Sequence, residues 1–565
     1  MNKSIKLTRG AIAWPGSSLA FKTGTWRVQR PEYQHRSAPC HTACPAGEDA
    51  QAYLALVAEE EYRKAWEVLT AVNPLPAITG RVCHHPCETS CNRRHLDAAI
   101  AIHNVERYLG DMALREGWTY PVGPLSSDGA PVAVVGAGPA GCSAAYHLAR
   151  LGYRTHLFEA LSEAGGLLRS AIPPYRLPAR ILDEEIARLL ECAISFHPGR
   201  RLGRDFSLQD LQADYKAIFL APGTQRSREW SIDGVTPRDL RVGLDLLKQW
   251  MDVGSIPTWE SVAIVGAGNT AIDLARILKR AAVPEVHVIS HKAIPGPGVP
   301  PEDAMPAIDR EIYQGLEEGV ILHEHRGVQR LILRGEQVVG VEMVHMKKLP
   351  DASGRMKRVA FEGTESLLHV EQVIPAIGQI VEPEGMESLL DYANFFSVDE
   401  MGRFAKHPGF FTGGDARGDR GTVSEAIGDG RRGALAIHAW MAGNDEVAES
   451  KGDPIGFEQI NLNYFEPGRR PEEPMLPVEA RGGFEEVELG LDKTPVINEG
   501  RRCFSCGSCL VCDNCWTLCP DTAVLRTEET LDNGAHYRFD YDYCKGCGLC
   551  AHECPTGFIL MHTEV

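Results

Sequence analysis

The chain has no long hydrophobic run and no excess of positive charge, and each absence argues against a class of protein. No stretch of roughly eighteen apolar residues occurs in the 565 residues, so we expect no membrane-spanning helix. Lysine and arginine number 58 against 76 aspartates and glutamates, which argues against binding to nucleic acid or to an anionic membrane. No apolar segment follows the basic residues Lys3, Lys6 and Arg9, so we expect no export signal and a cytoplasmic protein.

Cysteine is nearly absent from the middle of the chain, although there are 17 in total. Five lie between Cys40 and Cys91, ten lie between Cys503 and Cys554, and only Cys142 and Cys192 are isolated. Because cytosolic thiols stay reduced, this clustering indicates metal ligation rather than a disulfide framework. The length predicts about three to four domains.

Residues 131–141, PVAVVGAGPAG, are the clearest motif of the central region. An apolar run followed by Gly-x-Gly-x-x-Gly predicts a buried parallel strand, a tight turn and a helix from Pro139 to Arg150 whose N-terminus faces a pyrophosphate. A second strand is expected to end at an acidic residue that meets a ribose 2′-hydroxyl. The residues expected to bind this dinucleotide are Gly136, Gly138, Pro139, Ala140, Gly141 and Glu159.

The motif recurs at residues 262–271, VAIVGAGNTA, followed by a predicted helix to Arg280 and a strand over residues 285–290. Two such units predict two bound dinucleotides. No Cys-x-x-Cys pair falls within either unit, which disfavours a flavin-dependent disulfide reductase. The residues expected to bind the second dinucleotide include Gly266, Gly268, Asn269 and Thr270.

Two cysteine motifs precede the first unit, CHTACPAG at residues 40–47 and TGRVCHHPCETSC at residues 79–91. Cysteines at four-residue spacing suit an iron–sulfur cluster better than zinc, which favours Cys-x-x-Cys pairs. These segments resemble the N-terminal iron–sulfur domain of the glutamate synthase small subunit and of dihydropyrimidine dehydrogenase. The resemblance continues to about residue 440.

The resemblance implies a ligand set for these cysteines and also reveals a gap. The family has a further Cys-x-x-Cys shortly before the position of Cys40, and this chain lacks it. Glu106 falls at the family's non-cysteine ligand position, although it could instead be a solvated carboxylate on a helix. The implied ligands of one [4Fe-4S] cluster are Cys44, Cys83, Cys87 and Glu106, and those of half a second cluster are Cys40 and Cys91.

The resemblance also implies that the first unit binds FAD and that a nicotinamide domain is inserted into it. Asp415 would accept hydrogen bonds from the flavin ribityl chain, and a helix starting near Thr422 would stabilise negative charge on the reduced ring. The alternative for Asp415 is an ordinary turn residue. The further flavin-domain residues implied are Gly166, Gly378, Gly414, Asp415 and Thr422.

The family binds the 2′-phosphate of NADPH with a pair of arginines just after the second strand of the nicotinamide unit. This chain has Ser290-His291-Lys292 there. Without guanidinium groups the phosphate site is weaker, so we expect NADH. NADPH held by Lys292 and His291 stays open, and these two could also be simple exposed loop residues.

The C-terminal region carries the bacterial ferredoxin motif Cys-x₂-Cys-x₂-Cys-x₃-Cys-Pro twice. In that fold the fourth cysteine of each run ligates the other cluster. The predicted sets are therefore Cys509, Cys512, Cys515 and Cys554 for one cluster, and Cys544, Cys547, Cys550 and Cys519 for the other.

One pair of cysteines, Cys503 and Cys506, is left over and has the spacing that the N-terminal domain lacks. We hypothesise that this pair completes the cluster begun by Cys40 and Cys91, in the same chain or in a dimer mate. A reduced thiol pair or a shifted ferredoxin frame is the alternative. The total is then three to four [4Fe-4S] clusters.

The expected fold class is α/β, with two Rossmann-like dinucleotide-binding domains, the NAD domain inserted in the FAD domain, an N-terminal helical iron–sulfur domain and a C-terminal bacterial ferredoxin-like domain. The expected divisions are an extended arm (1–36), the iron–sulfur domain (37–120), the first segment of the FAD domain (130–225), the NAD(P) domain (226–367), the second segment of the FAD domain (368–445), a linker (446–500) and the ferredoxin domain (501–565).

Together these features predict an NAD(P)H:acceptor oxidoreductase in which hydride passes between nicotinamide and FAD, and single electrons pass through the clusters to or from partner redox subunits. The tail, DYCKGCGLCAHECPTG, resembles the ferredoxin-type subunit of 2-oxoacid oxidoreductases. The whole plan resembles the flavoproteins paired with dissimilatory sulfite reductase. A glutamate synthase small subunit, a non-catalytic electron-relay scaffold and a homo-oligomer within a larger complex stay open.

Overall fold

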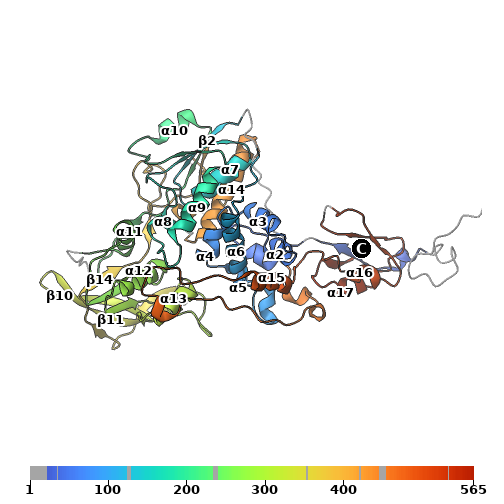
Figure 1. The fold of residues 1–565 in the computed structure, drawn as a ribbon. Coiled ribbons are helices and arrows are strands. Elements are labelled where there is room, and N and C mark those ends of the chain that lie inside the picture. The colour runs from blue at the N-terminus through green and yellow to red at the C-terminus, as the bar shows by residue number, and fades with distance from the viewer. Residues whose placement is uncertain are drawn as a thin grey trace, which may run out of the picture.

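The computed structural model describes residues 22–34, 36–123, 129–232, 240–350, 354, 356–418, 421–444, 453–531 and 533–564. Two sheet-based units form the main body, a group of N-terminal helices lies beside them, and a small unit with the C-terminus projects on the far side of these helices (Figure 1). Among the described helices, none combines the length and apolar composition that a membrane span requires.

The first sheet has five parallel strands, in which β2 is fully covered: Val132, Ala133 and Val134 are completely buried, as expected for a strand with helices on both faces. Its strand order is β16 (Phe410–Thr412), β5 (Ala217–Leu220), β2 (Pro131–Val135), β3 (Arg154–Phe158) and β4 (Ile194–His197). The helices of this unit are α7 (Pro139–Arg150), α8 (Leu167–Ser170), α9 (Ala179–Leu190), α10 (Leu208–Asp214) and α14 (Val423–Met441). Helices α7 and α14 pack against each other.

The second sheet has four parallel strands in the order β14 (Gln372–Pro375), β7 (Ser261–Val265), β8 (Glu285–Ile289) and β9 (Ile321–His323). Its helices are α11 (Gly243–Val253), α12 (Asn269–Arg280) and α13 (Asp309–Glu317). We expected the FAD domain to resume at residue 368, but β14 pairs in register with β7. The chain therefore leaves the second unit only after β14. It then forms β15 (Gln379–Ile380), which pairs with β6 (Arg226–Ser227) in a separate two-stranded sheet.

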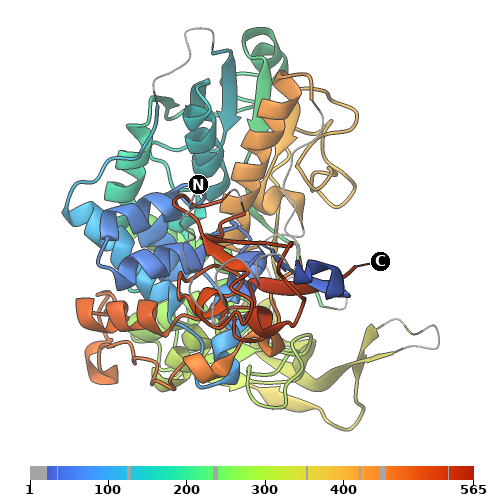
Figure 2. The same cartoon turned by 90° about the vertical axis from the view of Figure 1, so that its right-hand side faces the viewer.

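An antiparallel extension of the second unit consists of β10 (Arg326–Arg334), β11 (Gln337–Pro350), β12 (Met356–Ala360) and β13 (Ser366–Leu368). Strands β11 and β12 form an arm that stands out from the rest of the molecule (Figure 2).

The N-terminal iron–sulfur domain is helical, and prolines begin three of its helices, where their fixed φ suits the first turn. The helices are α1 (Pro39–Ala43), α2 (Ala50–Ala58), α3 (Tyr62–Thr70), α4 (Pro76–Val82), α5 (Pro86–Thr89) and α6 (Ile102–Arg115). Glu60 adopts a left-handed conformation (φ 63°) and separates the two helices α2 and α3.

The expected linker is packed against the body: Ile455 and Val487 are almost fully buried in it. Helix α15 follows and packs against α2. The remaining elements are α15 (Lys493–Arg502), α16 (Asn514–Thr517), β17 (Val524–Arg526), β18 (Tyr537–Phe539), α17 (Leu549–His552) and β19 (Ile559–Thr563).

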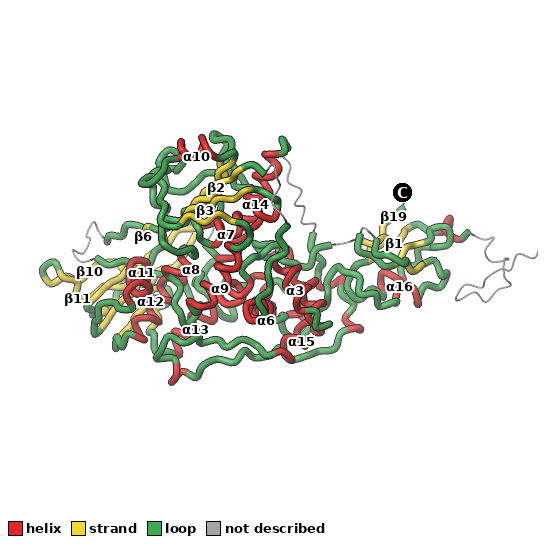
Figure 3. Tube along the Cα trace, turned by 45° about the horizontal axis from the view of Figure 1, so that its top comes forward, coloured by secondary structure: helices red, strands yellow, loops and turns green. Residues whose placement is uncertain are grey.

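The N-terminal arm is not a separate extension. Strand β1 (Gln29–Tyr33) pairs antiparallel with β19, from Gln29 opposite Thr563 to Tyr33 opposite Ile559, and the two lie side by side in the projecting unit (Figure 3). The first 21 residues lie outside the described part of the chain. The C-terminal unit therefore takes one of its strands from the beginning of the chain.

Candidate cofactor and iron–sulfur sites

The first glycine-rich loop leaves no room for a side chain at Gly136 or Gly141, whereas there is room beside Gly138. Gly136 has φ +98°, and a Cβ there would lie 2.1 Å from the Ala221 carbonyl oxygen. A Cβ on Gly141 would lie 1.8 Å from the Gly136 carbonyl oxygen, and one on Gly166 would lie 2.9 Å from the Gly138 Cα. Backbone alone lines this loop, as close approach of a pyrophosphate requires.

Glu159 follows β3 and lies against the same loop. Its carboxylate is buried and accepts hydrogen bonds from the Ala137 N–H at 2.7 Å and the Leu161 N–H at 2.9 Å. Pro139 and Ala140 form the first turn of α7 beside it. The predicted contacts of the first dinucleotide therefore lie together at the end of β2.

Asp415 is placed at the junction of β16 and α14. Burial, together with the charges of Glu425 and Asp429, raises the pKa of Asp415 to about 6, although a hydrogen bond with Thr224 acts in the opposite direction. Gly414 brings this turn onto α7, because a Cβ there would lie 3.0 Å from the Ala140 Cβ.

Thr422 caps α14, since its Oγ1 accepts a hydrogen bond from the Glu425 N–H at 3.2 Å. The N-terminus of this 19-residue helix therefore begins next to the site expected for the flavin, where its dipole favours negative charge.

The second glycine-rich loop resembles the first in its packing. A Cβ on Gly266 would lie 2.4 Å from the Ala376 carbonyl oxygen, whereas the space beside Gly268 is open. Thr270 Oγ1 accepts a hydrogen bond from Gln379 at 3.1 Å. Gly378 has φ +108° and lies in the connection from β14 to β15.

Asn269 is engaged by the protein itself. Its Oδ1 accepts a hydrogen bond from the Ile308 N–H at 3.0 Å, and its Nδ2 lies 3.3 Å from the His84 Nε2. His84 belongs to the iron–sulfur domain, so the start of α12 contacts the segment between Cys83 and Cys87.

Lys292 lies in a group of basic side chains that the sequence motif did not reveal. Burial and the charges of Arg358, Lys292 and Lys348 lower the pKa of His291 to about 4. Lys348 and Arg358 are directly opposite each other on β11 and β12, and like charges in that position destabilise a sheet. No local spacing connects them to residues 290–292, which is why sequence reasoning missed them.

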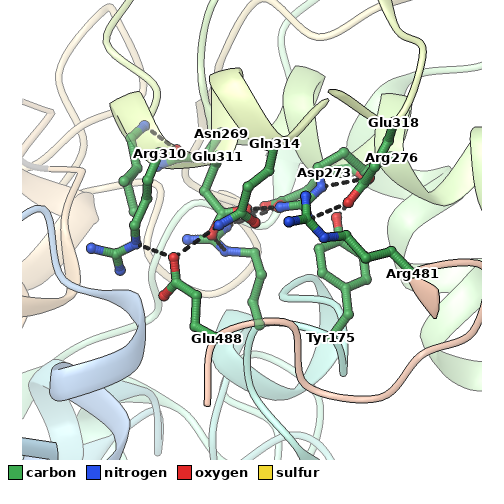
Figure 4. Close-up of polar contacts among 12 residues, drawn as sticks. Tyr175, Asn269, Asp273, Arg276, Arg310, Glu311, Gln314, Glu318, Arg481 and Glu488 are labelled. Atoms are coloured by element: carbon green, nitrogen blue, oxygen red, sulfur yellow. Dashed lines mark hydrogen bonds and ion pairs between the residues drawn. The ribbon is translucent and has the colours of Figure 1, made fainter. Parts of the chain in front are cut away.

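A buried ion network that the sequence also did not reveal ties α12 and α13 to the first unit (Figure 4). Arg176 contacts the Asp273 carboxylate at 2.7 Å and that of Glu311 at 3.0 Å. The guanidinium groups of Arg276 and Arg280 lie over the ring of Tyr175, 4.4 Å and 4.0 Å from its centroid. In the sequence, the network is visible only as charged residues such as Asp273, Arg276 and Arg280 within the predicted helix of the second dinucleotide unit.

The first set of cysteines combines both ends of the chain. Burial raises the pKa of Cys40 well above its usual value, and the charges of Cys503, Cys91 and Cys506 raise it further. Cys40 also packs against the buried clusters that contain Cys91 and Cys506. The four thiols therefore lie together in one chain.

The second set is centred on Cys83. Burial raises the pKa of Cys83 to about 12, with a contribution from the nearby Glu106, and Cys44 lies near both groups. Burial raises the pKa of Cys87 well above its usual value, with contributions from Cys44 and Cys83.

Glu106 is 3% exposed, so the solvated-carboxylate alternative is wrong. It accepts hydrogen bonds from Asn73 at 2.9 Å and from Thr79, and its Oε2 lies 3.7 Å from the His85 Nε2. Glu106 therefore lies next to Cys83 and Cys44, and its ligation of a cluster stays a prediction.

The ferredoxin-like unit brings its cysteines together in the crossed arrangement expected from the motif. Burial raises the pKa of Cys512, and the nearby thiols of Cys554 and Cys509 contribute. Burial likewise raises the pKa of Cys550 to about 12, with contributions that include Cys544 and Cys519. Within the described residues, no three His, Cys, Asp or Glu side chains converge on a single metal-ion position.

Two dinucleotide-binding folds joined to cysteine sets at both ends of the chain define a flavin- and nicotinamide-dependent oxidoreductase with iron–sulfur clusters. Residues 130–443 match the family model of pyridine nucleotide-disulphide oxidoreductases, and the chain belongs to this family. Residues 32–118 match dihydropyrimidine dehydrogenase domain II, 4Fe-4S cluster, and residues 537–560 match the 4Fe-4S binding domain.

The chain is 31% identical over 535 residues to NADPH-Fe(3+) oxidoreductase subunit beta of Geobacter sulfurreducens (strain DL-1 / KN400), covering 86% of this chain and 78% of the relative. It is 32% identical over 534 residues to NADP(+)-dependent formate dehydrogenase subunit beta of Moorella thermoacetica, and the match covers 88% of this chain and 73% of the relative. It is 30% identical over 432 residues to the glutamate synthase [NADPH] small chain of Azospirillum brasilense, and the match covers 72% of this chain and 87% of the relative.

These matches confirm the predicted fold class, the family resemblance and the prediction of an NAD(P)H-dependent oxidoreductase. The cofactors are FAD, NAD(P)H and [4Fe-4S] clusters.

Proposed function

We propose that this chain is the subunit that exchanges electrons between NADPH and a partner redox subunit in the cytoplasm. The observation that carries the proposal is the contact between α14 and the iron–sulfur domain. Ser424, in the first turn of α14, lies beside Cys83, and its hydroxyl lowers the pKa of that thiol against the effect of burial. One cysteine set therefore lies next to the helix that begins at the flavin site.

Further along α14 the contact continues. A Cβ on Gly428 would lie 2.0 Å from the Pro45 carbonyl oxygen, and the Arg432 Nη1 donates to the same oxygen at 2.9 Å. Pro45 follows Cys44 in the chain. Bound FAD supplies the chemistry that converts hydride exchange with nicotinamide into single-electron exchange with the clusters.

From this helix the cysteine sets continue toward the surface. Helix α1 carries Cys40, and Cys44 follows its last residue, so one helical turn connects two sets. The Thr556 Oγ1 donates to the Ser508 carbonyl oxygen at 2.7 Å, which connects the segment after Cys506 to the ferredoxin-like unit. Cys512 and Cys547 are exposed there, which favours this end for docking of the partner.

The partner is proposed by the kind of electron exchange it must support. The relatives named above are subunits of multi-subunit redox enzymes, and a 2-oxoacid oxidoreductase or dissimilatory sulfite reductase provides the same kind of one-electron acceptor or donor. The cytoplasmic location is supported by the grouping of the cysteines into sets suited to iron–sulfur clusters, because such ligands need a compartment that keeps thiols reduced. A homo-oligomer within the larger complex stays part of the proposal.

The choice of NADPH departs from our expectation of NADH. It is supported by the basic group around Lys292, which supplies cations where the family's arginine pair is missing, and by the NADPH- and NADP(+)-dependent names of the relatives.

The test is an assay of the purified, cluster-loaded chain with NADPH and a dye that accepts electrons from flavin. We expect reduction of the dye by the chain alone, faster with NADPH than with NADH. A chain that holds FAD but does not reduce the dye would be a passive relay, and the proposal would be wrong.

A further inference from the structure

Cys503 and Cys506 belong to neither ferredoxin set, and the structure places them against the N-terminal iron–sulfur domain. Burial raises the pKa of Cys503 to about 12, and the nearby thiols Cys506 and Cys91 contribute. Asn92, the residue after Cys91, donates its Nδ2 to the Cys506 sulfur at 3.5 Å.

The helix before this pair is fixed to the same domain at several points. The Ala101 N–H donates to the Glu499 carboxylate at 2.6 Å, and the Arg502 guanidinium contacts Asp97 at 3.0 Å. A Cβ on Gly500 would lie 2.6 Å from the Leu54 carbonyl oxygen, so α15 sits directly on α2. These contacts are within one chain, and no dimer mate is needed.

The loop after α15 is held equally closely. Arg93 donates its Nη1 to the Arg502 carbonyl oxygen at 2.7 Å and lies 4.9 Å from the centroid of the Phe504 ring. Phe504, between the two cysteines, is 2% exposed. The pair is therefore presented to Cys40 and Cys91 by a packed element.

We propose that Cys40, Cys91, Cys503 and Cys506 together ligate one [4Fe-4S] cluster, shared between the N-terminal iron–sulfur domain and the C-terminal part of the same chain. Four thiolates are the complete ligand set of such a cluster, and each thiol releases its proton to solvent when it binds iron. Within the proposed function this cluster lies between the set near α14 and the ferredoxin-like unit, so it connects the two halves of the electron path.

The test measures iron and acid-labile sulfide per FAD in the full-length Cys503→Ser/Cys506→Ser variant. We expect iron to fall from about sixteen to about twelve per chain while the FAD content stays the same. Cys192→Ser is the matched control, because this buried thiol lies in the FAD unit, with its sulfur 4.0 Å from the Arg188 carbonyl oxygen, and should keep all iron. Unchanged iron in the double variant overturns the proposal.

The opposite pair gives an independent test, which also serves if the first variant does not accumulate. Cys40→Ser/Cys91→Ser should lose the same four irons or so, and the quadruple variant should lose no more than either double variant. A loss of about eight irons in the quadruple variant would mean two separate sites and would overturn the shared cluster. Dye reduction by NADPH takes electrons at the flavin, so it should persist in the Cys503→Ser/Cys506→Ser variant whether or not the shared cluster exists. A lack of dye reduction by the unaltered chain would count against the proposed function and not against the shared cluster.

Discussion

The ring of Tyr33, near the start of the chain, is stacked on the ring of Phe539, near its end, with the centroids 4.3 Å apart. The Tyr33 hydroxyl lies 3.9 Å from the Cys515 sulfur. Burial raises the pKa of Tyr33, and Cys515, Cys550 and Cys509 contribute, so this side chain lies between the two ferredoxin cysteine sets. A residue that precedes the ferredoxin-like unit by hundreds of positions thus completes its interior.

Tyr33→Ala should destabilise that unit by about 3 kcal/mol, the cost of removing a large buried ring. The measurement is the temperature at which cluster absorbance is lost. Tyr33→Phe keeps the stacked ring and should behave like the unaltered chain. An alanine variant that bleaches at the normal temperature would show that β1 is dispensable for the unit.

Arg176→Ala should destabilise the protein by about 3 to 5 kcal/mol, because it leaves the buried carboxylates of Asp273 and Glu311 without their shared cation. The measurement is the denaturant midpoint of unfolding. Arg180→Ala is the control, since Arg180 is exposed and its pair with Glu184 is worth well under about 1 kcal/mol. Equal midpoints for the two variants would contradict a structural role for the network.

The sequence predicted the local elements of this fold but not the contacts between distant segments. The helix expected from Pro139 to Arg150 is confirmed to the residue, because glycines and apolar residues specify it locally. The pairing of β1 with β19, and of β14 with β7, depends on strands far away in the chain, which no local pattern encodes. The same holds for the cations of Lys348 and Arg358. Counting cysteine ligands pointed to Cys503 and Cys506, which lie beside Cys40 and Cys91 in the structure, and their ligation of iron stays a prediction.

The charged form of His103 should stabilise the folded protein at neutral pH, and this contribution should be lost at alkaline pH. Burial alone would lower its pKa, but the carboxylates of Glu88, at 2.8 Å, and of Glu473, at 3.1 Å, outweigh it and raise the pKa to about 9. Because the folded pKa lies above the unfolded value near 6.5, the stabilisation is fully present below about pH 6.5 and is lost as the pH rises through about 9. It amounts to at most about 3 kcal/mol.

The measurement for His103 is the denaturant midpoint by tryptophan fluorescence at pH 6 and pH 9, relative to the His103→Gln variant. The stability difference between the two proteins should shrink at the higher pH. A difference that does not change with pH would mean that His103 is neutral in the folded protein.

Lys348→Ala should lower kcat/KM with NADPH by roughly tenfold, since a charge-assisted hydrogen bond to the 2′-phosphate contributes about 1.5 kcal/mol or more. The value with NADH should stay the same, because NADH has no such phosphate. Lys347→Ala is the matched control: it is the neighbouring residue on β11, and successive side chains of a strand point to opposite faces. Equal losses with both nucleotides would mean that the basic group has no part in selectivity.

Glu106→Ala should lower iron by about four per chain if its carboxylate is the fourth ligand of the cluster held by Cys44, Cys83 and Cys87. Glu106→Gln should keep the iron, because the amide oxygen retains a donor in the same position. Glu48→Ala is the matched control, since Glu48 is a buried carboxylate that accepts a hydrogen bond from the same Asn73, at 2.8 Å. A ligand role requires that only Glu106→Ala loses iron, because removal of a structural hydrogen bond would affect the Glu106 and Glu48 variants alike.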